Sequence, residues 1–260
     1  MFKLIIIGGT GGMGQLITNT FKDELDIYIY SRDPSKARKF ASELGVNPAV
    51  KQDIYDADII IVSVPISQTL KTCSEIAPLM KPNSLLIDIS SVKTGIVDKL
   101  TIPDKIEYIS MHPLFGPLGS FNDQNVILIP VKTNKWIDYV INLLEKHGST
   151  VSTLSFQEHD RIMSNVQVIH HFSYLCLGVF LSLNPVQPQF FTRSYKKTID
   201  SFKNYQNNLS IMLDIQKLNP YSKSVRQKFS DLVSELAQLP PNKLESKVYD
   251  AFSKFFKSIS

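Results

Sequence analysis

A glycine-rich loop directly after a short apolar run constrains the fold of this chain more than any other feature. Residues 4–7 are four consecutive aliphatic side chains, and Gly9, Gly11 and Gly14 follow with the spacing G-x-G-x-x-G at the start of a predicted helix over 12–21. A strand, a tight glycine loop and a helix in this order are typical of a βαβ unit that binds a dinucleotide. Gly9 allows the tight turn, Gly11 lets the backbone approach a pyrophosphate, and Gly14 lets helix and strand pack closely. We expect the phosphates to meet the helix N-terminus and the whole loop: Gly9, Thr10, Gly11, Gly12, Met13 and Gly14.

The first half of the chain continues this alternation of strands and helices. Helical stretches are predicted over 34–44, 67–80 and 133–146, and they separate short aliphatic or β-branched runs over 26–30, 57–64, 84–89, 106–110 and 126–131. This spacing predicts an α/β fold, with a Rossmann-type, doubly wound and mostly parallel sheet. Strands made almost entirely of Ile, Val and Leu indicate that helices cover both faces of the sheet.

The second half of the chain is predicted to be helical, because no clear strand pattern follows residue 156. A long helix is expected over 157–183, with an apolar stripe at helical spacing: Ile162, Val166, Ile169 and Phe172. Three or four more helices follow, with breaks at proline-containing pairs: Asn184-Pro185, Asn219-Pro220 and Pro240-Pro241. We therefore divide the chain into a dinucleotide-binding domain, 1–153, and an all-helical domain, 154–260, that binds substrate and dimerises.

Composition and charge narrow the class of protein. The 260 residues are 43% hydrophobic and 20% charged, which excludes a disordered or collagen-like chain. Two cysteines without a C-x-x-C pair predict neither a disulfide scaffold nor a zinc site, and we expect no metal and a reducing cytoplasm. The N-terminus has no signal-peptide cleavage site, and the apolar run 172–183 is too short to span a bilayer, so we expect no membrane partner. Residues 188–260 carry 12 Lys/Arg against 6 Asp/Glu, which suits a solvated helical surface or an anionic substrate. No nucleic-acid-binding motif is present, so no nucleic-acid partner is expected.

The end of the second predicted strand bears on the choice of cofactor. An NAD site usually has an acidic residue there, which binds the ribose 2′-hydroxyl. Here Ser31 and Arg32 occupy about that place, and Lys36 follows one helical turn later. Hydroxyl and cationic groups suit a 2′-phosphate, so the sequence favours NADP over NAD. Asp33 leaves two alternatives open: it is the NAD acid in a shifted register, or it caps the next helix together with Pro34.

Four further motifs follow in a characteristic order, each at or after a predicted strand or on the long helix. They are Val62-Ser63-Val64-Pro65, Asp88-Ile89-Ser90-Ser91-Val92-Lys93, His112-Pro113-Leu114-Phe115-Gly116-Pro117, and Glu158-His159-Asp160-Arg161-Ile162-Met163 leading to Gln167 and His171. This series resembles the prephenate dehydrogenase (TyrA) family, particularly its archaeal and bacterial monofunctional members, from residue 3 to about residue 220. The resemblance implies oxidation of prephenate at its C4 alcohol, hydride transfer to NAD(P)+, and loss of the ring carboxylate as carbon dioxide. The product would be 4-hydroxyphenylpyruvate, a tyrosine precursor, with arogenate as an alternative substrate.

The catalytic roles follow from strand ends and from the resemblance. Open α/β sheets bind ligands beyond the carboxyl ends of their strands, where Pro65, Ser91 and His112 are predicted to lie. We expect Val64 and Pro65 to contact the cofactor and His112 to be the general base, since the pKa of histidine lies near neutrality. Ser91 resembles the family serine that contacts the reacting hydroxyl and orients the histidine, although a helix cap before Val92-Lys93 remains open. Lys93 is expected to be a surface cation outside the catalytic machinery.

Substrate binding is assigned to the helical domain. His171 matches the substrate-binding histidine of the family, and Gln167 lies one turn before it. His159 and Asp160 are expected to be a feature of the helix start, with His159 a possible contact. The family holds the side-chain carboxylate with an arginine, and Lys203 occupies that register here, with Arg193 as a substitute.

The sequence leaves two alternative functions open and suggests one mode of assembly. The chain could be a different NADP-dependent oxidoreductase of the same two-domain plan, or a non-catalytic dinucleotide-sensing protein. A homodimer through the helical domain, as the family commonly forms, would bury its apolar side chains: Phe229, Leu232, Leu236, Val248, Phe252, Phe255 and Phe256.

Overall fold

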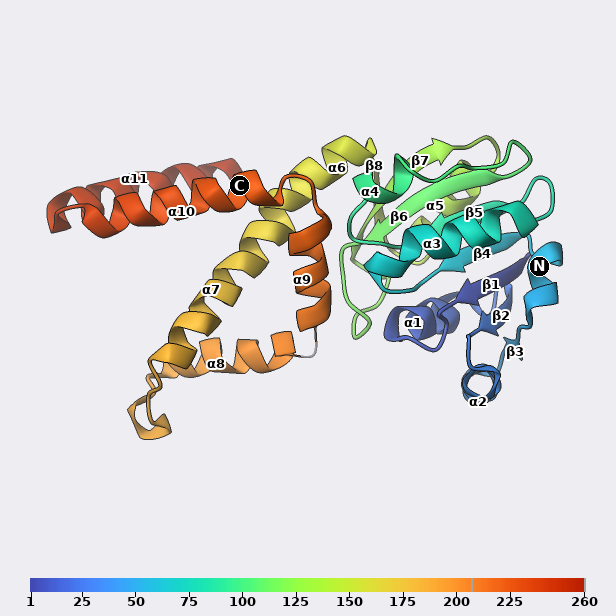
Figure 1. Ribbon diagram of the computed structural model, residues 1–260, viewed down its shortest axis with the longest axis horizontal. Coiled ribbons are helices and arrows are strands. Elements are labelled where there is room, and N and C mark those ends of the chain that lie inside the picture. Colours follow the sequence, from blue (N-terminus) through green and yellow to red (C-terminus); the bar gives the residue numbers. More distant parts are fainter. Residues whose placement is uncertain (207, 260) are drawn as a thin grey trace.

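One eight-stranded sheet organises the first part of the chain in the computed structural model, which describes residues 1–206 and 208–259 (Figure 1). The strand order is β3-β2-β1-β4-β5-β6-β7-β8, and every neighbouring pair is parallel except β6 and β7. The strands are β1 (Lys3–Ile7), β2 (Asp26–Tyr30), β3 (Asn47–Pro48), β4 (Ile59–Val62), β5 (Leu85–Asp88), β6 (Glu107–Pro113), β7 (Asn125–Lys132) and β8 (Thr150–Thr153). This confirms the Rossmann-type, mostly parallel sheet.

Helices cover both faces of the sheet. They are α1 (Gly12–Phe21), α2 (Pro34–Leu44), α3 (Ile66–Ile76), α4 (Thr94–Val97) and α5 (Trp136–Lys146), with short 3-10 turns η1 (Lys51–Asp56) and η2 (Ala77–Leu79). Side chains of β1 alternate between the two faces: Leu4 and Ile6 belong to one buried apolar cluster, and Ile5 and Ile7 to the other. The alternation is the two-residue period of a strand, and burial on both sides explains the continuous aliphatic run in the sequence.

Two strands were not predicted from the sequence, and both have weak local patterns. β3 is only two residues long and includes a proline, and β8 reads Thr-Val-Ser-Thr with a single aliphatic side chain. Both are edge strands of the sheet, and nearly all their side chains are exposed, so neither needs an apolar run.

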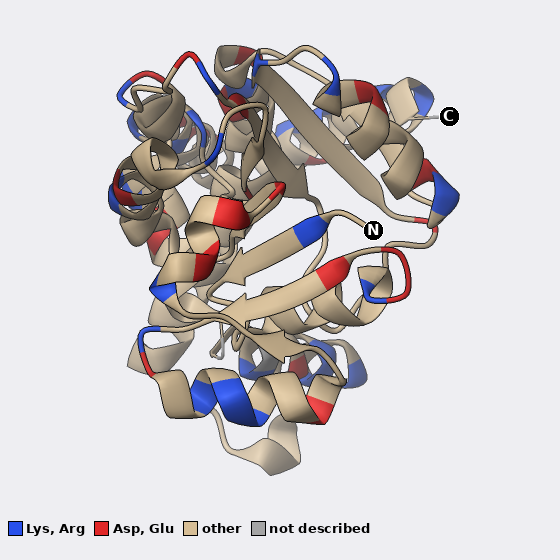
Figure 2. Cartoon of the chain, turned by 90° about the vertical axis from the view of Figure 1, so that its right-hand side faces the viewer, with Lys and Arg blue, Asp and Glu red and all other residues tan. Residues whose placement is uncertain are grey.

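Charged side chains are mixed over the surface of the sheet-containing part (Figure 2). Several of them form ion pairs, such as Lys3 with Asp53 at 3.0 Å and Lys146 with Glu24 at 2.7 Å. The Lys146–Glu24 pair is exposed, and exposed pairs contribute only about 0–1 kcal/mol each to stability.

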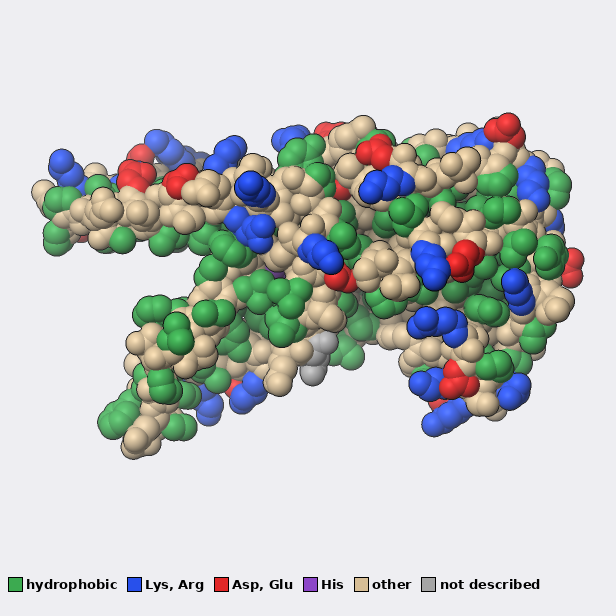
Figure 3. Space-filling view, viewed as in Figure 1, with side chains coloured by type: hydrophobic (Ala, Val, Ile, Leu, Met, Phe, Trp, Pro, Cys, Tyr) green, Lys and Arg blue, Asp and Glu red, His purple; other side chains and the backbone are tan. Residues whose placement is uncertain are grey.

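The second part of the chain is helical, as predicted, and its helices break at the predicted prolines. A continuous helix runs through α6 (Phe156–Met163), a π-helical segment η3 (Ser164–Ile169) and α7 (His170–Leu183). The turn η4 (Pro188–Phe190) and four helices follow: α8 (Arg193–Gln206), α9 (Leu209–Leu218), α10 (Ser222–Gln238) and α11 (Pro241–Ile259). Figure 1 shows α10 and α11 projecting side by side away from the sheet, and Figure 3 shows apolar side chains on this arm and on α7 across a notch.

The predicted apolar stripe of the long helix is partly wrong. Val166 is 54% exposed, whereas Met163 and Val168 are buried. The wider turn of the π-helical segment changes the phase of the helix, so a regular 3.6-residue period misplaces the buried positions.

The long helix also differs from the sequence expectation about membranes. At 28 residues, Phe156–Leu183 is long and apolar enough to cross a membrane by length and composition, since the helix extends upstream of the apolar run. Only 6% of its apolar window is buried within the chain. Length and composition are weak evidence for a span, because a helix that packs on another protein surface has the same properties.

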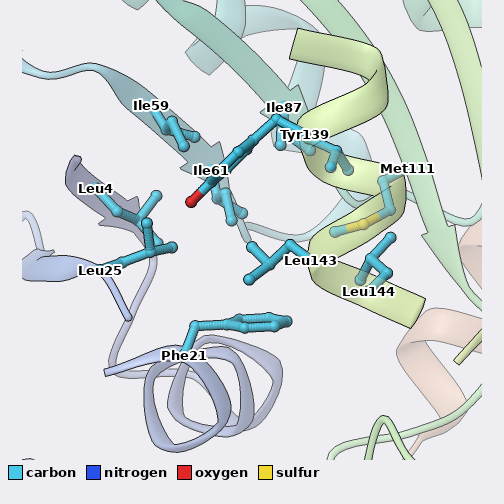
Figure 4. Close-up of a pocket in the computed structure, with 11 residues that line it drawn as sticks. Leu4, Phe21, Leu25, Ile59, Ile61, Ile87, Met111, Tyr139, Leu143 and Leu144 are labelled. Carbon is cyan, nitrogen blue, oxygen red and sulfur yellow. The ribbon is translucent and has the colours of Figure 1, made fainter. Parts of the chain in front are cut away.

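A small apolar cavity of about 30 Å³ lies in the core beneath α1 and α5. Figure 4 shows Leu4, Phe21 and Leu143 among the side chains that surround it. Its lining is hydrophobic apart from the ring of Tyr139, so it is an imperfection of packing and carries no chemistry.

Candidate active site

The glycine loop between β1 and α1 makes two close backbone contacts. Gly8 has a φ of +83°, and a Cβ atom there would collide with the carbonyl oxygen of Ser63. A Cβ atom on Gly14 would lie 2.5 Å from the Cα of Gly9, so α1 and the loop pack as closely as glycine allows. Gly8 was not singled out from the sequence, although it, and not Gly9, has the left-handed backbone conformation in this turn. The signal was present in the doubled glycine that directly follows the strand.

The other side of the same loop is open. A Cβ atom on Gly11 would meet one atom within 4 Å, the carbonyl oxygen of Gly8 at 3.3 Å. Gly11 is extended and precedes α1 without a side-chain cap, which leaves the first N–H groups of that helix for an outside acceptor. Thr10 is held through its carbonyl oxygen by the Gln15 amide at 3.0 Å, and Met13 lies in the first turn of α1.

The carboxyl ends of β1 and β4 lie side by side. Ile7 pairs with Val62, and the side chain of Val64 lies beside Gly8. Pro65 directly precedes α3. The strand order reverses between β1 and β4, because β2 and β3 lie on one side of β1 and the later strands lie on the other. Doubly wound sheets bind dinucleotides at such a point.

At the end of β2, Asp33 caps the following helix. Its Oδ1 accepts hydrogen bonds from the backbone N–H groups of Ser35 at 2.9 Å and Lys36 at 3.3 Å, and Pro34 begins α2. Its own N–H donates to the Ser31 hydroxyl at 3.3 Å. The sequence left two roles open for Asp33, and in the structure this residue caps α2. Arg32 and Lys36 are exposed, and their side chains form no ion pair with the described residues.

His112 lies near the end of β6 and is only 2% exposed. Its Nδ1 is 2.8 Å from Nε2 of His159, and its Nε2 is 3.5 Å from the side-chain nitrogen of Gln167. The Nδ1 of His159 is in turn 2.8 Å from Oδ1 of Asp160. His159 and Asp160 are thus part of the site and not a feature of the helix start, which the Ser155 hydroxyl caps instead.

Asp160 also joins the segment that carries Ser91. Its carboxylate accepts hydrogen bonds from the N–H groups of Lys93 at 3.0 and 3.2 Å and of Thr94 at 2.8 Å, at the start of α4. Ser91 does not cap this helix, because the carboxylate from α6 does. Ser91 is half-buried, and its hydroxyl has no hydrogen bond to any described residue.

Lys93 is buried, so the expectation that it is a surface cation is wrong. Its side chain is completely buried, and Nζ donates to the carbonyl oxygen of Met111 at 2.7 Å and lies 3.5 Å from Asp88. A buried cation is tolerated because the partner carboxylate and the carbonyl replace its water shell. Asp88 also accepts from Tyr108 at 2.7 Å, so this pair fixes the segment that carries Ser91 against β6.

Burial and hydrogen bonds shift the pKa values of the three linked residues His112, His159 and Asp160. Burial, with the nearby His159 and Lys93, lowers the pKa of His112 well below 6.5. Burial also lowers the pKa of His159, although the hydrogen bond to Asp160 opposes this. Burial alone would raise the pKa of Asp160, but the hydrogen bonds from His159 and Thr94 lower it. Near neutral pH the carboxylate is therefore charged and both imidazoles are neutral.

The π-helical segment shapes the side of the site opposite β6. Two side chains bind backbone carbonyl oxygens of the long helix. Gln216, in α9, donates to the carbonyl oxygen of Val168 at 2.8 Å, and Asn219, directly after α9, donates to that of Asp160 at 2.9 Å. These bonds support an irregular stretch of a kind that is frequent at functional sites.

Two buried polar atoms on the long helix lack a partner. They are Oε1 of Gln167 and Nδ1 of His171, and neither has a hydrogen bond within the described part of the chain. Burial, with the neighbouring His170, lowers the pKa of His171 to about 4. Buried polar atoms are nearly always hydrogen-bonded, so this pair is suited to a polar ligand. His170 points elsewhere and contacts the Tyr205 hydroxyl at 3.2 Å.

The two candidate cations lie at opposite ends of α8. Arg193 is its first residue, and Lys203 is in its last turn, 3.0 Å from Asp200. Figure 1 shows that α8 begins near the far end of α7 and runs back toward α9 and the sheet. Both side chains are exposed, and neither contacts His112, Gln167 or His171.

The fold and the glycine loop define a Rossmann-type protein of the nucleotide-binding class. Residues 18–153, slightly more than half of the chain, match the family model described as prephenate dehydrogenase, nucleotide-binding domain, and the chain belongs to this family.

Individual relatives agree with this assignment. A probable arogenate/prephenate dehydrogenase of Methanocaldococcus jannaschii is 33% identical over 92% of this chain and 56% of its own length. The T-protein of Haemophilus influenzae is 28% identical over 71% of this chain and 46% of its own length. The chain thus spans about half the length of these curated relatives.

Solved structures share the fold. Prephenate dehydrogenase from A. aeolicus, in complex with hydroxyphenyl propionate and NAD+, superposes with a TM-score of 0.81 at 20% identity, covering 99% of this chain and 97% of that one. Synechocystis arogenate dehydrogenase superposes with a TM-score of 0.72 at 17% identity, covering 98% of this chain and 99% of that one.

Proposed function

We propose that this chain oxidises prephenate with NAD(P)+, releasing the ring carboxylate as carbon dioxide and forming 4-hydroxyphenylpyruvate. The observation that carries the proposal is the position of His112. It lies buried at the carboxyl end of β6, bound through Nδ1 to His159, with Nε2 facing Gln167, and burial lowers its pKa well below 6.5. This arrangement suits a general base that accepts a hydroxyl proton.

The loop after β1 fits a dinucleotide, because it is open at Gly11 and leads into an uncapped helix N-terminus. When bound there, the nicotinamide supplies the hydride acceptor for the carbon that bears the alcohol. His112 takes the hydroxyl proton on Nε2 as the C–O bond becomes a carbonyl. After the carboxylate leaves and the ring becomes aromatic, the same proton returns to the phenol oxygen, so no net proton is released. Ser91 contacts the reacting hydroxyl, and Gln167 and His171 bind the substrate.

We also propose that the chain binds NADP in preference to NAD. Arg32 and Lys36 are exposed cations without an ion pair to the described residues, next to the open loop. The carboxylate of Asp33 is engaged in capping α2. Both features support binding of a 2′-phosphate.

The proposed domain division at 153/154 is supported by the last strand, which ends at Thr153, and the long helix, which begins at Phe156. We also propose a cytoplasmic homodimer formed through the helical domain. Large apolar side chains on α7, α10 and α11 are at least a third exposed: Val179, Phe180, Leu183, Leu232, Val248, Phe252, Phe255 and Phe256. Figure 3 shows apolar side chains on both sides of the notch between α7 and the arm formed by α10 and α11. A monomer rarely exposes an apolar surface of this extent. Light scattering after gel filtration is expected to give twice the mass of the chain, and a monomer at micromolar concentration would contradict the dimer.

A direct assay tests the reaction. Purified protein is mixed with NADP+ or NAD+ and with prephenate or arogenate, and reduced nicotinamide is followed by its absorbance. Arogenate is included because the name of the Methanocaldococcus jannaschii relative pairs both substrates. Reduction with prephenate supports the proposal, and reduction with arogenate alone moves the substrate to its amino analogue. If neither substrate is oxidised, the proposed function is wrong, and the chain is better explained as a different NADP-dependent oxidoreductase or as a dinucleotide-sensing protein.

A further inference from the structure

A continuous chain of hydrogen bonds leads from His112 through His159 to Asp160. The two links are both 2.8 Å long, and His159 and Asp160 are completely buried. The carboxylate of Asp160 accepts hydrogen bonds from the N–H groups of Lys93 and Thr94, and a carboxylate can only accept. The directions of the two links follow from this acceptor and from the lowered pKa of His159, which keeps that imidazole neutral.

The proton positions can be assigned in sequence. Because Asp160 accepts, Nδ1 of His159 carries a hydrogen, and Nε2 of a neutral His159 is then an acceptor. Nδ1 of His112 must therefore donate, which leaves the lone pair of His112 on Nε2. Nε2 is the nitrogen that lies 3.5 Å from the side-chain nitrogen of Gln167.

We propose that His159 and Asp160 are positioning residues, which hold His112 in the tautomer protonated on Nδ1 so that Nε2 is free to accept the substrate's proton. The last step rests on the proposed function, whereas the tautomer itself does not. When Nε2 takes a proton, the positive charge of His112 lies at one end of a chain that ends in a carboxylate, which stabilises it.

The carboxylate is itself held in place by a second loop. The N–H groups of Lys93 and Thr94 bind both of its oxygens. Asp160 therefore links the orientation of His112 to the segment that carries Ser91, although the three residues come from β6, α6 and the loop before α4.

Asp160→Asn tests the assignment because an amide has only one oxygen. The N–H groups of Lys93 and Thr94 require that oxygen, so the NH₂ group must face Nδ1 of His159. Each hydrogen bond then reverses, and His112 carries its proton on Nε2, where it cannot act as a base. We expect kcat to fall roughly 10²–10⁴-fold, the range for losing general-base catalysis or its correct tautomer, with a smaller change in KM.

The direct readout is the ¹⁵N spectrum of protein labelled at histidine, which shows which ring nitrogen of each imidazole is protonated. The chain has only five histidines, and the signals of His112 are those that disappear in His112→Asn. We expect Nδ1 protonation in the wild type and Nε2 protonation in Asp160→Asn.

A second pair of variants separates orientation from folding. His159→Gln keeps an acceptor where Nε2 lies, whereas His159→Leu removes it. We expect His159→Gln to keep the Nδ1-protonated tautomer and to recover much of the kcat that His159→Leu loses. Glu24→Gln is a matched control, since it removes the carboxylate 2.7 Å from Nε2 of His147, outside the site, and should leave kcat unchanged.

The outcomes are distinguishable from those of the proposed function. If the wild-type His112 is protonated on Nε2, or if its tautomer and kcat are the same in His159→Leu as in the wild type, the positioning role is wrong. If the tautomer switches as expected but neither prephenate nor arogenate is oxidised, the positioning role stands and the proposed function fails. Should Asp160→Asn not fold, the wild-type spectrum and the two His159 variants still decide.

Discussion

A Cβ atom added to Gly12 would lie 2.7 Å from the Cβ of Pro117. The nucleotide loop and the loop that follows His112 are therefore in direct contact, although they are separated by more than a hundred residues. In our proposal, this packing places a dinucleotide on the first loop relative to His112, which lies at the end of β6 just before the second loop.

This contact predicts the effect of enlarging Gly12. Gly12→Ala forces the two loops apart, and overpacking of this kind typically costs about 1–3 kcal/mol. We expect dinucleotide affinity to weaken roughly 5- to 150-fold, measured by titration calorimetry. Gly95→Ala is the control, because a Cβ atom there meets nothing within 4 Å. Equal affinities in the wild type and Gly12→Ala would mean that the loops separate freely.

Cofactor selection depends on Arg32 in our proposal. Arg32→Asp, alone or with Ser31→Gly, removes an ionic hydrogen bond to a 2′-phosphate, worth about 1.5–3 kcal/mol. We expect the Kd for NADP to rise roughly 10- to 150-fold, with a much smaller effect on NAD. Asp33→Ala should instead lower stability by about 0.5–2 kcal/mol through loss of the helix cap, without changing the preference. A wild-type preference for NAD, or equal losses for both cofactors, would point to Asp33 as the selector.

Removal of the base should impair turnover more than binding. His112→Asn is expected to lower kcat roughly 10²–10⁴-fold while the dinucleotide still binds, and Ser91→Ala should cost less. Since the pKa of His112 lies well below 6.5, kcat/KM of the wild type should be flat near neutrality and fall only at more acidic pH. Steady-state kinetics across pH measure both effects, and near-normal turnover in His112→Asn would remove this residue from the mechanism.

The same depressed pKa values predict how stability depends on pH. The folded protein keeps His171 neutral down to about pH 4, whereas an unfolded histidine takes up its proton near 6.5. Below that pH the unfolded state binds more protons, so the free energy of unfolding falls as pH drops from about 6.5 to about 4, and it is unaffected above. His112 and His159 act in the same direction. Urea midpoints at about pH 7.5 and pH 5 test this, and His171→Gln should reduce the difference between them.

The elements recognised in the sequence are those with a local signature. The aliphatic run of β1 and the glycines after it lie within a dozen residues, and each element of the βαβ unit has its own period. The edge strand β8 lacks such a period because three of its four side chains are exposed and only Val151 is half-buried.

The parts of the site that were missed depend on contacts between distant segments. His112 and His159 are 47 residues apart, and only the docking of α6 against β6 brings their nitrogens together. Lys93 reads as a surface cation, since burial of lysine depends on a carboxylate partner, Asp88, whose position the sequence does not reveal. The π-helical turn before His171 likewise has no regular period to detect.

The side-chain carboxylate of the proposed substrate needs a cationic partner in the helical domain. A dianion needs cations, and residues 188–260 carry the chain's positive surplus. Lys203 lies in the last turn of α8, toward the sheet, and its only described ionic partner is the exposed Asp200, which a substrate could displace at little cost. Arg193 starts the same helix at its far end, so it offers better bidentate geometry from a less favourable position. We therefore expect Lys203→Ala to raise the KM for prephenate about ten-fold or more, the value of one ionic hydrogen bond, while kcat changes less and Arg193→Ala has little effect. Steady-state kinetics with both variants measure this, and Asp200→Ala, which frees Lys203, should lower KM or leave it unchanged. The reverse result would assign the carboxylate to Arg193, and an unchanged KM in both variants would make prephenate itself doubtful and favour a different substrate for the same chemistry.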